Sequence, residues 1–202
     1  QSLSVCNNSL SGPLPREWAK MTQMQLLYLC WNKFSSSLPP EWSSMIELEN
    51  LYIYNNLLTG SLPTEYQSFS QMQDLNLQSN LLSGTLPVEW SSMTQIYALT
   101  LTANELTGNL PSQWSSLTQL YVLMLDKNRL SGSLPKNWSS FSQLSLFQLN
   151  NNNLTGTIPA TWLGMSSLSR IALSQNKFTG DVPTFFLNLS TMQDFRVSKN
   201  SF

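Results

Sequence analysis

An asparagine recurs every 24 residues along the chain, and this spacing limits the fold more than any other feature. The nine copies are Asn8, Asn32, Asn56, Asn80, Asn104, Asn128, Asn152, Asn176 and Asn200. Apolar residues keep fixed places around each copy, as Leu75, Leu77 and Leu82 do around Asn80. Equal intervals without an insertion indicate stacked units that bury their apolar side chains against one another.

The residues before each asparagine predict a short strand. Leu75 and Leu77 alternate with Asp74 and Asn76, so the leucines share one face and the polar residues share the other. One repeat cannot bury its own leucines, so neighbouring strands should pair in parallel at a spacing of about 4.8 Å. The asparagine amide then lies where the chain leaves the strand, and it can bond backbone groups that no strand partner satisfies.

The residues after each asparagine predict a turn, an extended segment and a short helix. Gly84 permits the turn and Leu86-Pro87 imposes an extended path. A ring follows in every repeat, at Trp18, Trp42, Tyr66, Trp90, Trp114, Trp138, Trp162 and Phe186. An apolar residue three places later fits one 3₁₀ turn on the convex side. Such a row of rings is more often core than a ligand site.

These residues resemble two known groups of repeat proteins. The segment LTGTIP at 154–159 matches the L-x-G-x-I-P of plant-type leucine-rich repeats, and LTGSLP at 58–63 is similar. The ending L-P-x-E-W-S-S-M-T at 86–94 resembles the surface leucine-rich-repeat proteins of kinetoplastid protozoa, the promastigote surface antigen group. The resemblance covers essentially all 202 residues.

The resemblance implies a fold and a location. The expected fold is an α/β repeat: a right-handed leucine-rich-repeat solenoid with parallel strands on the concave face and short 3₁₀ or extended segments on the convex face. Residues 1–202 should form one solenoid of about eight repeats, with partial repeats at both ends and no caps. Members of the kinetoplastid group are secreted or membrane-anchored and are implicated in adhesion, so the chain is expected outside the cell or at its surface.

The concave face is where a partner should bind, because its outward positions vary while the scaffold is constant. The candidate partner-binding residues are Leu26, Tyr28, Trp31, Tyr52, Tyr54, Asp74, Asp126, Arg170 and Arg196. One end of this face is aromatic and the other is charged, and Tyr, Trp and Arg usually carry interface energy. Tyr97 and Tyr121 lie where strands begin and can reach the same face. In the alternative reading the aromatic residues only stack on each other, or an N-terminal cap covers them.

A row of glutamates stands before the rings, at Glu17, Glu41, Glu65 and Glu89. Carboxylates at a fixed pitch could bind calcium. The favoured reading places them in the first turn of each short helix, where negative charge is stabilised. We therefore expect no metal site and no cofactor.

Two further patterns concern modification. N-x-S/T sequons occur at Asn7, Asn137, Asn153 and Asn188 and are candidate glycosylation sites. Cys6 and Cys30 occupy the same position in adjacent repeats, and paired strands bring their Cα atoms close enough for a disulfide. In-register Cβ atoms point the same way, at the wide end of the permitted separation, so a disulfide and two free thiols both remain open.

Composition excludes several function classes and leaves one alternative. The chain has no histidine, no paired carboxylates at a defined separation and no phosphate-binding glycine motif, so we expect no enzyme. Its net charge of −1 does not suit nucleic-acid binding, and it has no apolar run long enough for a membrane span. Residues 1–101 carry three basic and seven acidic side chains, whereas residues 102–202 carry seven basic and four acidic ones. Recognition or adhesion is the leading function, with a protein or glycan ligand. The alternative is a structural subunit that stacks head to tail into an extracellular filament.

Overall fold

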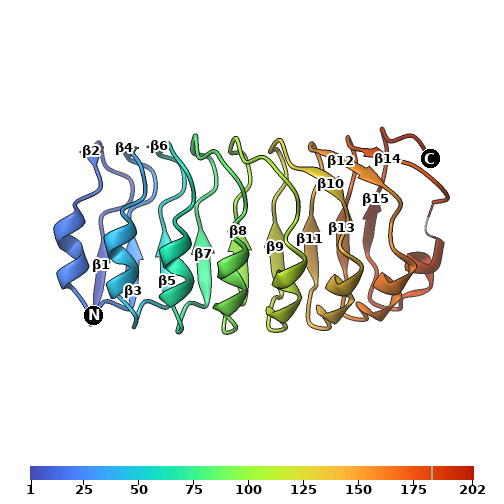
Figure 1. Cartoon of the computed structure of the whole chain (residues 1–202), viewed down its shortest axis with the longest axis horizontal. Coiled ribbons are helices and arrows are strands. Elements are labelled where there is room, and N and C mark those ends of the chain that lie inside the picture. The colour runs from blue at the N-terminus through green and yellow to red at the C-terminus, as the bar shows by residue number, and fades with distance from the viewer. Residues whose placement is uncertain (183) are drawn as a thin grey trace.

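A computed structural model describes residues 1–182 and 184–202. Within these residues, nine short strands pair in parallel into one sheet (Figure 1). They are β1 (Ser2–Ser4), β3 (Leu26–Tyr28), β5 (Asn50–Tyr52), β7 (Asp74–Asn76), β8 (Ala98–Thr100), β9 (Val122–Met124), β11 (Leu146–Gln148), β13 (Arg170–Ala172) and β15 (Asp194–Arg196). The register advances by one repeat at each step, so Leu51 lies beside Leu75 and Leu75 beside Leu99.

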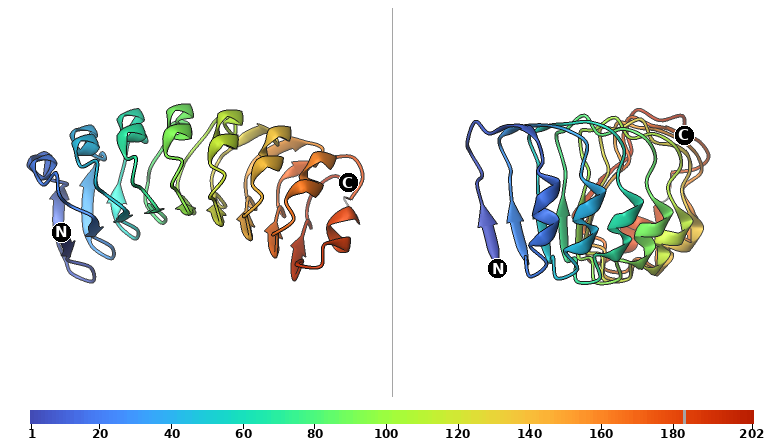
Figure 2. Two further views of the ribbon diagram at one scale, coloured as in Figure 1. Left: turned by 90° about the horizontal axis from the view of Figure 1, so that it is seen from below. Right: turned by 60° about the vertical axis from the view of Figure 1, so that its left-hand side comes forward.

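The opposite side of each repeat carries a 3₁₀ helix. These helices are η1 (Arg16–Lys20), η2 (Pro40–Ser44), η3 (Thr64–Ser68), η4 (Val88–Ser92), η5 (Ser112–Ser116), η6 (Lys136–Ser140), η7 (Ala160–Gly164) and η8 (Thr184–Asn188). Figure 2 shows the molecule as an arc, with the sheet lining the inner side and the helices the outer side. The predicted solenoid, with strands on the concave face and 3₁₀ turns on the convex face, is confirmed.

Two small sheets join the outer helices to the inner strands along one edge. One contains β2 (Ser11–Pro13), β4 (Lys33–Ser36) and β6 (Leu57–Leu58), and the other contains β10 (Ser131–Ser133), β12 (Asn153–Gly156) and β14 (Lys177–Phe178). Along this edge the chain passes through one residue of left-handed conformation in each repeat. That residue is glycine at positions 12, 60, 84, 108, 132, 156 and 180. Ser36 holds the same place in its repeat with φ of +73°, a conformation that costs free energy in a residue with a Cβ.

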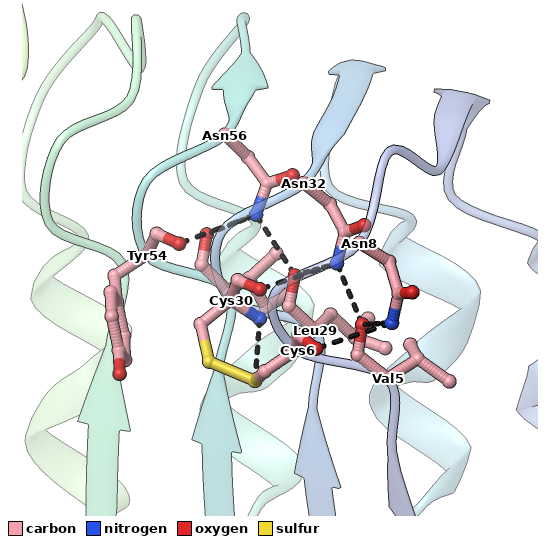
Figure 3. Close-up of a disulfide and its surroundings, with 9 residues drawn as sticks. Val5, Cys6, Asn8, Leu29, Cys30, Asn32, Tyr54 and Asn56 are labelled. Carbon is pink, nitrogen blue, oxygen red and sulfur yellow. Dashed lines mark hydrogen bonds between the residues drawn. A yellow bond between two sulfur atoms is a disulfide. The ribbon is translucent and has the colours of Figure 1, made fainter.

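The asparagines form the predicted ladder inside the turn. Asn104 is 8% exposed. Its Nδ2 donates to the carbonyls of Leu77 and Leu101, each at 3.1 Å, and its Oδ1 accepts from the Leu82 amide at 3.0 Å. The same three bonds recur at Asn32 and Asn56 beside the first strands. Figure 3 shows the bonds that both amides donate to the Leu29 carbonyl. Each asparagine from Asn32 to Asn200 therefore satisfies backbone groups of its own repeat and of the preceding one.

The rings form a second row, which is buried in the core from Trp42 to Phe186 and partly exposed at Trp18. Trp90 and Trp114 are fully buried and stack with centroids 6.5 Å apart and planes 5° apart. The Trp114 indole donates to the carbonyl of Pro87 in the preceding repeat at 2.9 Å. The interpretation of the ring row as core is therefore correct, because burial and the indole hydrogen bond both bind one repeat to the next.

Candidate functional site

The concave face carries the residues that sequence reasoning singled out, arranged in columns that run from strand to strand. The first outward position of each strand gives one column, which contains Ser2, Leu26, Asn50, Asp74, Ala98, Val122, Leu146, Arg170 and Asp194. The second outward position gives the next column, which contains Ser4, Tyr28, Tyr52, Asn76, Thr100, Met124, Gln148, Ala172 and Arg196. Neighbours in a column lie in register on adjacent strands, so the surface follows directly from the 24-residue period.

The aromatic end is an organised cluster rather than a set of separate side chains. The rings of Tyr28 and Tyr52 stack with centroids 4.8 Å apart, and Tyr54 packs against Tyr52 at 6.3 Å. We call these three residues the tyrosine cluster. Each of them is half-buried, and so is Leu26 beside them. The stacking considered in the alternative reading therefore occurs, but it leaves part of each ring accessible.

A short hydrogen bond fixes the centre of the tyrosine cluster. The Tyr52 hydroxyl donates to Asp74 Oδ2 at 2.6 Å and lies 3.4 Å from Asn50 Nδ2, which donates to it. Burial, together with the bond to Asp74, raises the pKa of Tyr52 to about 12. Burial also raises the pKa of Asp74, while the bond from Tyr52 lowers it. The pair holds the ring in one orientation before any partner arrives.

Trp31 contributes the most exposed aromatic side chain at this end. It follows β3 at the turn, with φ of +55°, and 54% of the residue is exposed. Its backbone amide donates to the carbonyl of Tyr54 at 3.0 Å, so a hydrogen bond to the next repeat holds its backbone in place. A large apolar side chain held at an exposed turn is a typical anchor for a partner.

Asp126 is buried, although its outward position predicted an accessible side chain. It is 4% exposed, and its Oδ1 accepts a 2.7 Å hydrogen bond from the hydroxyl of Thr102. Thr102 precedes it by one repeat, so the 24-residue register already places the two side by side. In this structure Asp126 therefore supports the concave face and offers a partner little surface.

The two arginines at the charged end differ in their surroundings. Arg196 is bound to Asp194 through Nη2–Oδ2 at 2.7 Å and Nε–Oδ1 at 2.9 Å. Arg170 is exposed, and within residues 1–182 and 184–202 it forms no ion pair. A hollow of about 390 Å³ lies near Arg196, lined by Lys127, Gln148 and Asn150 among others. The charged end is thus distant in sequence from the tyrosine cluster and separate in character.

Cys6 and Cys30 are joined by a disulfide beside the aromatic end (Figure 3). Their Cα atoms are 4.6 Å apart, close to the spacing of neighbouring strands. The Cys6 sulfur also accepts from the Cys30 amide at 3.0 Å. The bond links the first two strand turns immediately before Asn7 and Trp31.

The glutamate row lies on the convex side, whereas the sequons are spread over several surfaces. Asn7 holds in the first repeat the place that Trp31 holds in the second. Glu17, Glu41, Glu65 and Glu89 stand in the first turns of η1 to η4. Across the described ranges, no three His, Cys, Asp or Glu side chains come together as a metal site would require. All four sequon asparagines, Asn7, Asn137, Asn153 and Asn188, are exposed.

Family models match three segments of this chain. A model described as leucine rich repeat matches residues 118–178, and a second of the same description matches residues 23–45 and 47–69. Together these segments span more than half of the sequence, and their repeats coincide with the strand and 3₁₀ units of the solenoid.

The chain is a leucine-rich-repeat protein.

Solved structures similar to this leucine-rich-repeat protein include plant receptors. The plant peptide hormone receptor RGFR1, solved with RGF2, is 30% identical with a TM-score of 0.95; the match covers 96% of this chain and 31% of that one. The ectodomain of GASSHO1/SCHENGEN3 from Arabidopsis thaliana, solved with CASPARIAN STRIP INTEGRITY FACTOR 2, is 30% identical with a TM-score of 0.96, and the match covers 99% and 24%. This chain therefore spans a third or less of the length of these receptor chains.

The same fold also occurs with another function. A plant ice-binding protein shares it at 20% identity with a TM-score of 0.70, over 100% of this chain and 76% of that one. The sequence matches none of the curated proteins. Among the described helices of this leucine-rich-repeat protein, none has the length and apolar character to cross a membrane. Function must therefore be argued from the concave surface itself.

Proposed function

We propose that this chain is a non-catalytic extracellular recognition module that binds an extended protein or peptide partner across its concave face. The observation that carries the proposal is the tyrosine cluster, which is pre-ordered by stacking and by the Tyr52–Asp74 bond yet still partly exposed. Ordered aromatic side chains bind at low cost in conformational entropy, since little rotamer freedom remains to be lost.

Three observations support this function. The plant peptide hormone receptor RGFR1 was solved in complex with RGF2, and the ectodomain of GASSHO1/SCHENGEN3 in complex with CASPARIAN STRIP INTEGRITY FACTOR 2. The disulfide between Cys6 and Cys30 suits an oxidising, extracellular setting. The resemblance of residues 86–94 to the promastigote surface antigen group favours a role at a cell surface, in recognition or adhesion. We also propose the exposed sequons Asn7, Asn137, Asn153 and Asn188 as glycan acceptors in that setting.

Binding to a candidate cell surface tests the proposal. Trp31→Ala and Tyr54→Ala should each weaken binding by about 2 kcal/mol or more, roughly 30-fold in affinity, because each removes an aromatic anchor. Glu41→Ala is the matched control, since Glu41 stands on the convex helix η2 and should leave binding unchanged. Normal binding by both concave variants would reject this site.

The filament alternative predicts a different pattern of effects. It rests on the uneven charge of the two halves of the chain. Introducing a charge through Leu3→Asp or Phe202→Asp should then shorten particles seen by electron microscopy, while Trp31→Ala should not. Long particles that respond only to the end variants would support stacking over recognition.

A further inference from the structure

A second aromatic feature lies outside the tyrosine cluster, along the edge where the concave strands begin. Tyr97 and Tyr121 immediately precede β8 and β9, and their rings stack with centroids 5.2 Å apart and planes 3° apart. They are 49% and 41% exposed. Two parallel tyrosine rings with this exposure are not needed to close the core, which consists of other side chains.

The stack stops at Tyr121 because the next two residues in the same column are small. Ser145 and Ser169 follow at the 24-residue spacing, and the amide of Ser145 donates to the carbonyl of Tyr121 at 3.0 Å. A hollow of about 350 Å³ lies where further rings would have continued the stack. Its lining includes Tyr121, Ser145, Leu146, Ser169, Arg170 and Gln193. We call this feature the rim hollow; its size falls within the range of small-ligand sites.

The polar groups of the rim hollow are uncommitted. Within residues 1–182 and 184–202, the side chains of Ser145, Ser169 and Gln193 make no hydrogen bond to protein, and Arg170 makes no ion pair. The carboxylate nearest to Arg170 by strand register is Asp194, and that carboxylate is bound to Arg196 at 2.7 Å. The guanidinium of Arg170 is therefore available to an anionic group from outside.

We propose that the rim hollow binds one carboxylate-bearing sugar ring. The apolar face of the ring stacks on the free face of Tyr121, because polarised C–H groups are attracted to the negative face of an aromatic ring. The carboxylate pairs with Arg170 in a charge-assisted contact. The hydroxyls of the sugar bond with Ser145, Ser169 and Gln193.

The lining decides between a sugar and an aromatic side chain of a peptide. A phenyl or indole ring would cover the two serines and Gln193 without offering them partners, and leaving polar groups unmet costs affinity. A sugar carries a hydroxyl on most of its ring carbons and can meet them. The inference rests on the proposed recognition role, in which it assigns an acidic glycan as part of the ligand.

Saturation-transfer NMR with methyl glucuronide tests the assignment directly. The matched probe is methyl glucoside, which keeps the ring and the remaining hydroxyls and lacks the carboxylate. We expect the glucuronide to bind about tenfold more tightly, because only it can pair with Arg170. Equal affinity for the two probes would overturn the role of Arg170.

Variants locate the binding. Arg170→Gln should remove the tenfold preference and keep weak binding of both probes. Ser145→Tyr should extend the ring stack, fill the rim hollow and abolish both, while thermal unfolding shows that the fold survives. Arg129→Gln is the control, since Arg129 is paired with Glu105 at 3.3 Å away from the hollow. Undiminished glucuronide binding by Ser145→Tyr would overturn the proposal.

A dipeptide probe separates the two ligand classes. Acetyl-tyrosyl-glutamate offers an aromatic ring and a carboxylate without sugar hydroxyls, so its binding in place of methyl glucuronide would reject the sugar. These titrations need no protein partner. If glucuronide fails to bind while Trp31→Ala still weakens cell-surface binding, only the sugar assignment is wrong; the reverse result rejects the partner site at the tyrosine cluster.

Discussion

The hydroxyl of Tyr52 donates a 2.6 Å hydrogen bond to Oδ2 of Asp74, which ties the tyrosine cluster to the neighbouring strand. The bond spans β5 and β7, which are adjacent in the concave sheet. It places a carboxylate beside a phenol in a partly dehydrated position, and burial raises the pKa of both groups. The stability of the aromatic end should therefore depend on pH in two separate ranges.

Replacing Asp74 with Asn should raise the melting temperature at pH 7. The folded-state pKa of Asp74 lies above its usual 3.8, so folding favours the protonated form and the native state loses stability as pH rises through that pKa. Asparagine can still accept from Tyr52 through Oδ1 without carrying the charge. We expect a rise of about 2 °C at pH 7 that shrinks toward zero below pH 4. A lower melting temperature for Asp74→Asn at pH 7 would show that the hydrogen bond to the charged carboxylate stabilises the fold by more than burial of the charge costs.

Tyr52→Phe should remove one source of alkaline instability. Because burial raises the folded pKa of Tyr52 to about 12, its contribution is complete below pH 10 and is lost as pH rises toward 12. The melting temperature of the wild type should therefore fall more steeply between pH 10 and 12 than that of the variant. Tyr121→Phe serves as the control because it removes an exposed phenol. Parallel melting curves for wild type and Tyr52→Phe would contradict the assignment.

Asn104→Ala should destabilise the protein by about 3 kcal/mol. It leaves the buried Leu82 amide without a partner, and such an unmet group costs about 1–3 kcal/mol. It also removes one of the two side-chain donors to the carbonyl of Leu77, which keeps its bond from Asn80. Glu105→Ala should cost less than about 1 kcal/mol, because its 3.3 Å bridge to Arg129 is exposed. Urea unfolding of both variants measures the difference. Equal losses would argue against the asparagine ladder.

The ladder and the ring row could be predicted from the sequence because each depends on one residue type at a fixed period. Asn104 and Trp114 interact with adjacent repeats, so the register alone identifies their partners. The outward columns could also be assigned, since Tyr28 and Tyr52 alternate with buried leucines. Whether a stack of two tyrosines leaves accessible surface depends on side-chain angles that the period does not determine.

The sequence could not predict how far each outward side chain of the concave face is buried. Asp126 and Arg170 both occupy outward positions, yet Asp126 is buried and bonded to Thr102 whereas Arg170 is exposed. The rim hollow was missed for a similar reason. It arises where Ser145 follows Tyr121 in one column, and a change from large to small residues within a column is the signal that would have found it.

Ser36→Gly should stabilise the protein by about 0.5–1 kcal/mol. Ser36 has φ of +73° at a place where the equivalent residues are glycines, and relief of this strain exceeds the entropy that glycine adds to the unfolded chain. Ser37→Gly is the matched control, because Ser37 has no positive φ and should only lose stability. Chemical denaturation should show a higher free energy of unfolding for Ser36→Gly and a lower one for Ser37→Gly. A loss in both variants would mean that φ at position 36 is not limiting.

Reducing the disulfide should loosen the first two repeats alone. Closing a loop of this length restricts the unfolded chain by about 3 kcal/mol, and contacts in a repeat stack reach only to neighbours. Hydrogen exchange should show about 100-fold faster exchange at β1 and β3, with β11 and β13 unchanged. The Cys6→Ser, Cys30→Ser double variant should behave like the reduced protein. Uniform acceleration along the chain would indicate global unfolding instead.

The indole bonds also determine what kinds of length change the architecture tolerates. Trp90 donates to the carbonyl of Pro63 at 2.9 Å, and Trp114 donates to that of Pro87 at the same distance. If residues 73–96 were removed, Trp114 would meet Pro63 as Trp90 does now, and every rung of the asparagine ladder would find an equivalent partner. Removal of any number other than a multiple of 24 would break both rows at once. Genes for such chains can therefore lengthen or shorten by whole units through unequal recombination, and the ligand-facing surface can be rewritten one strand at a time without a new core.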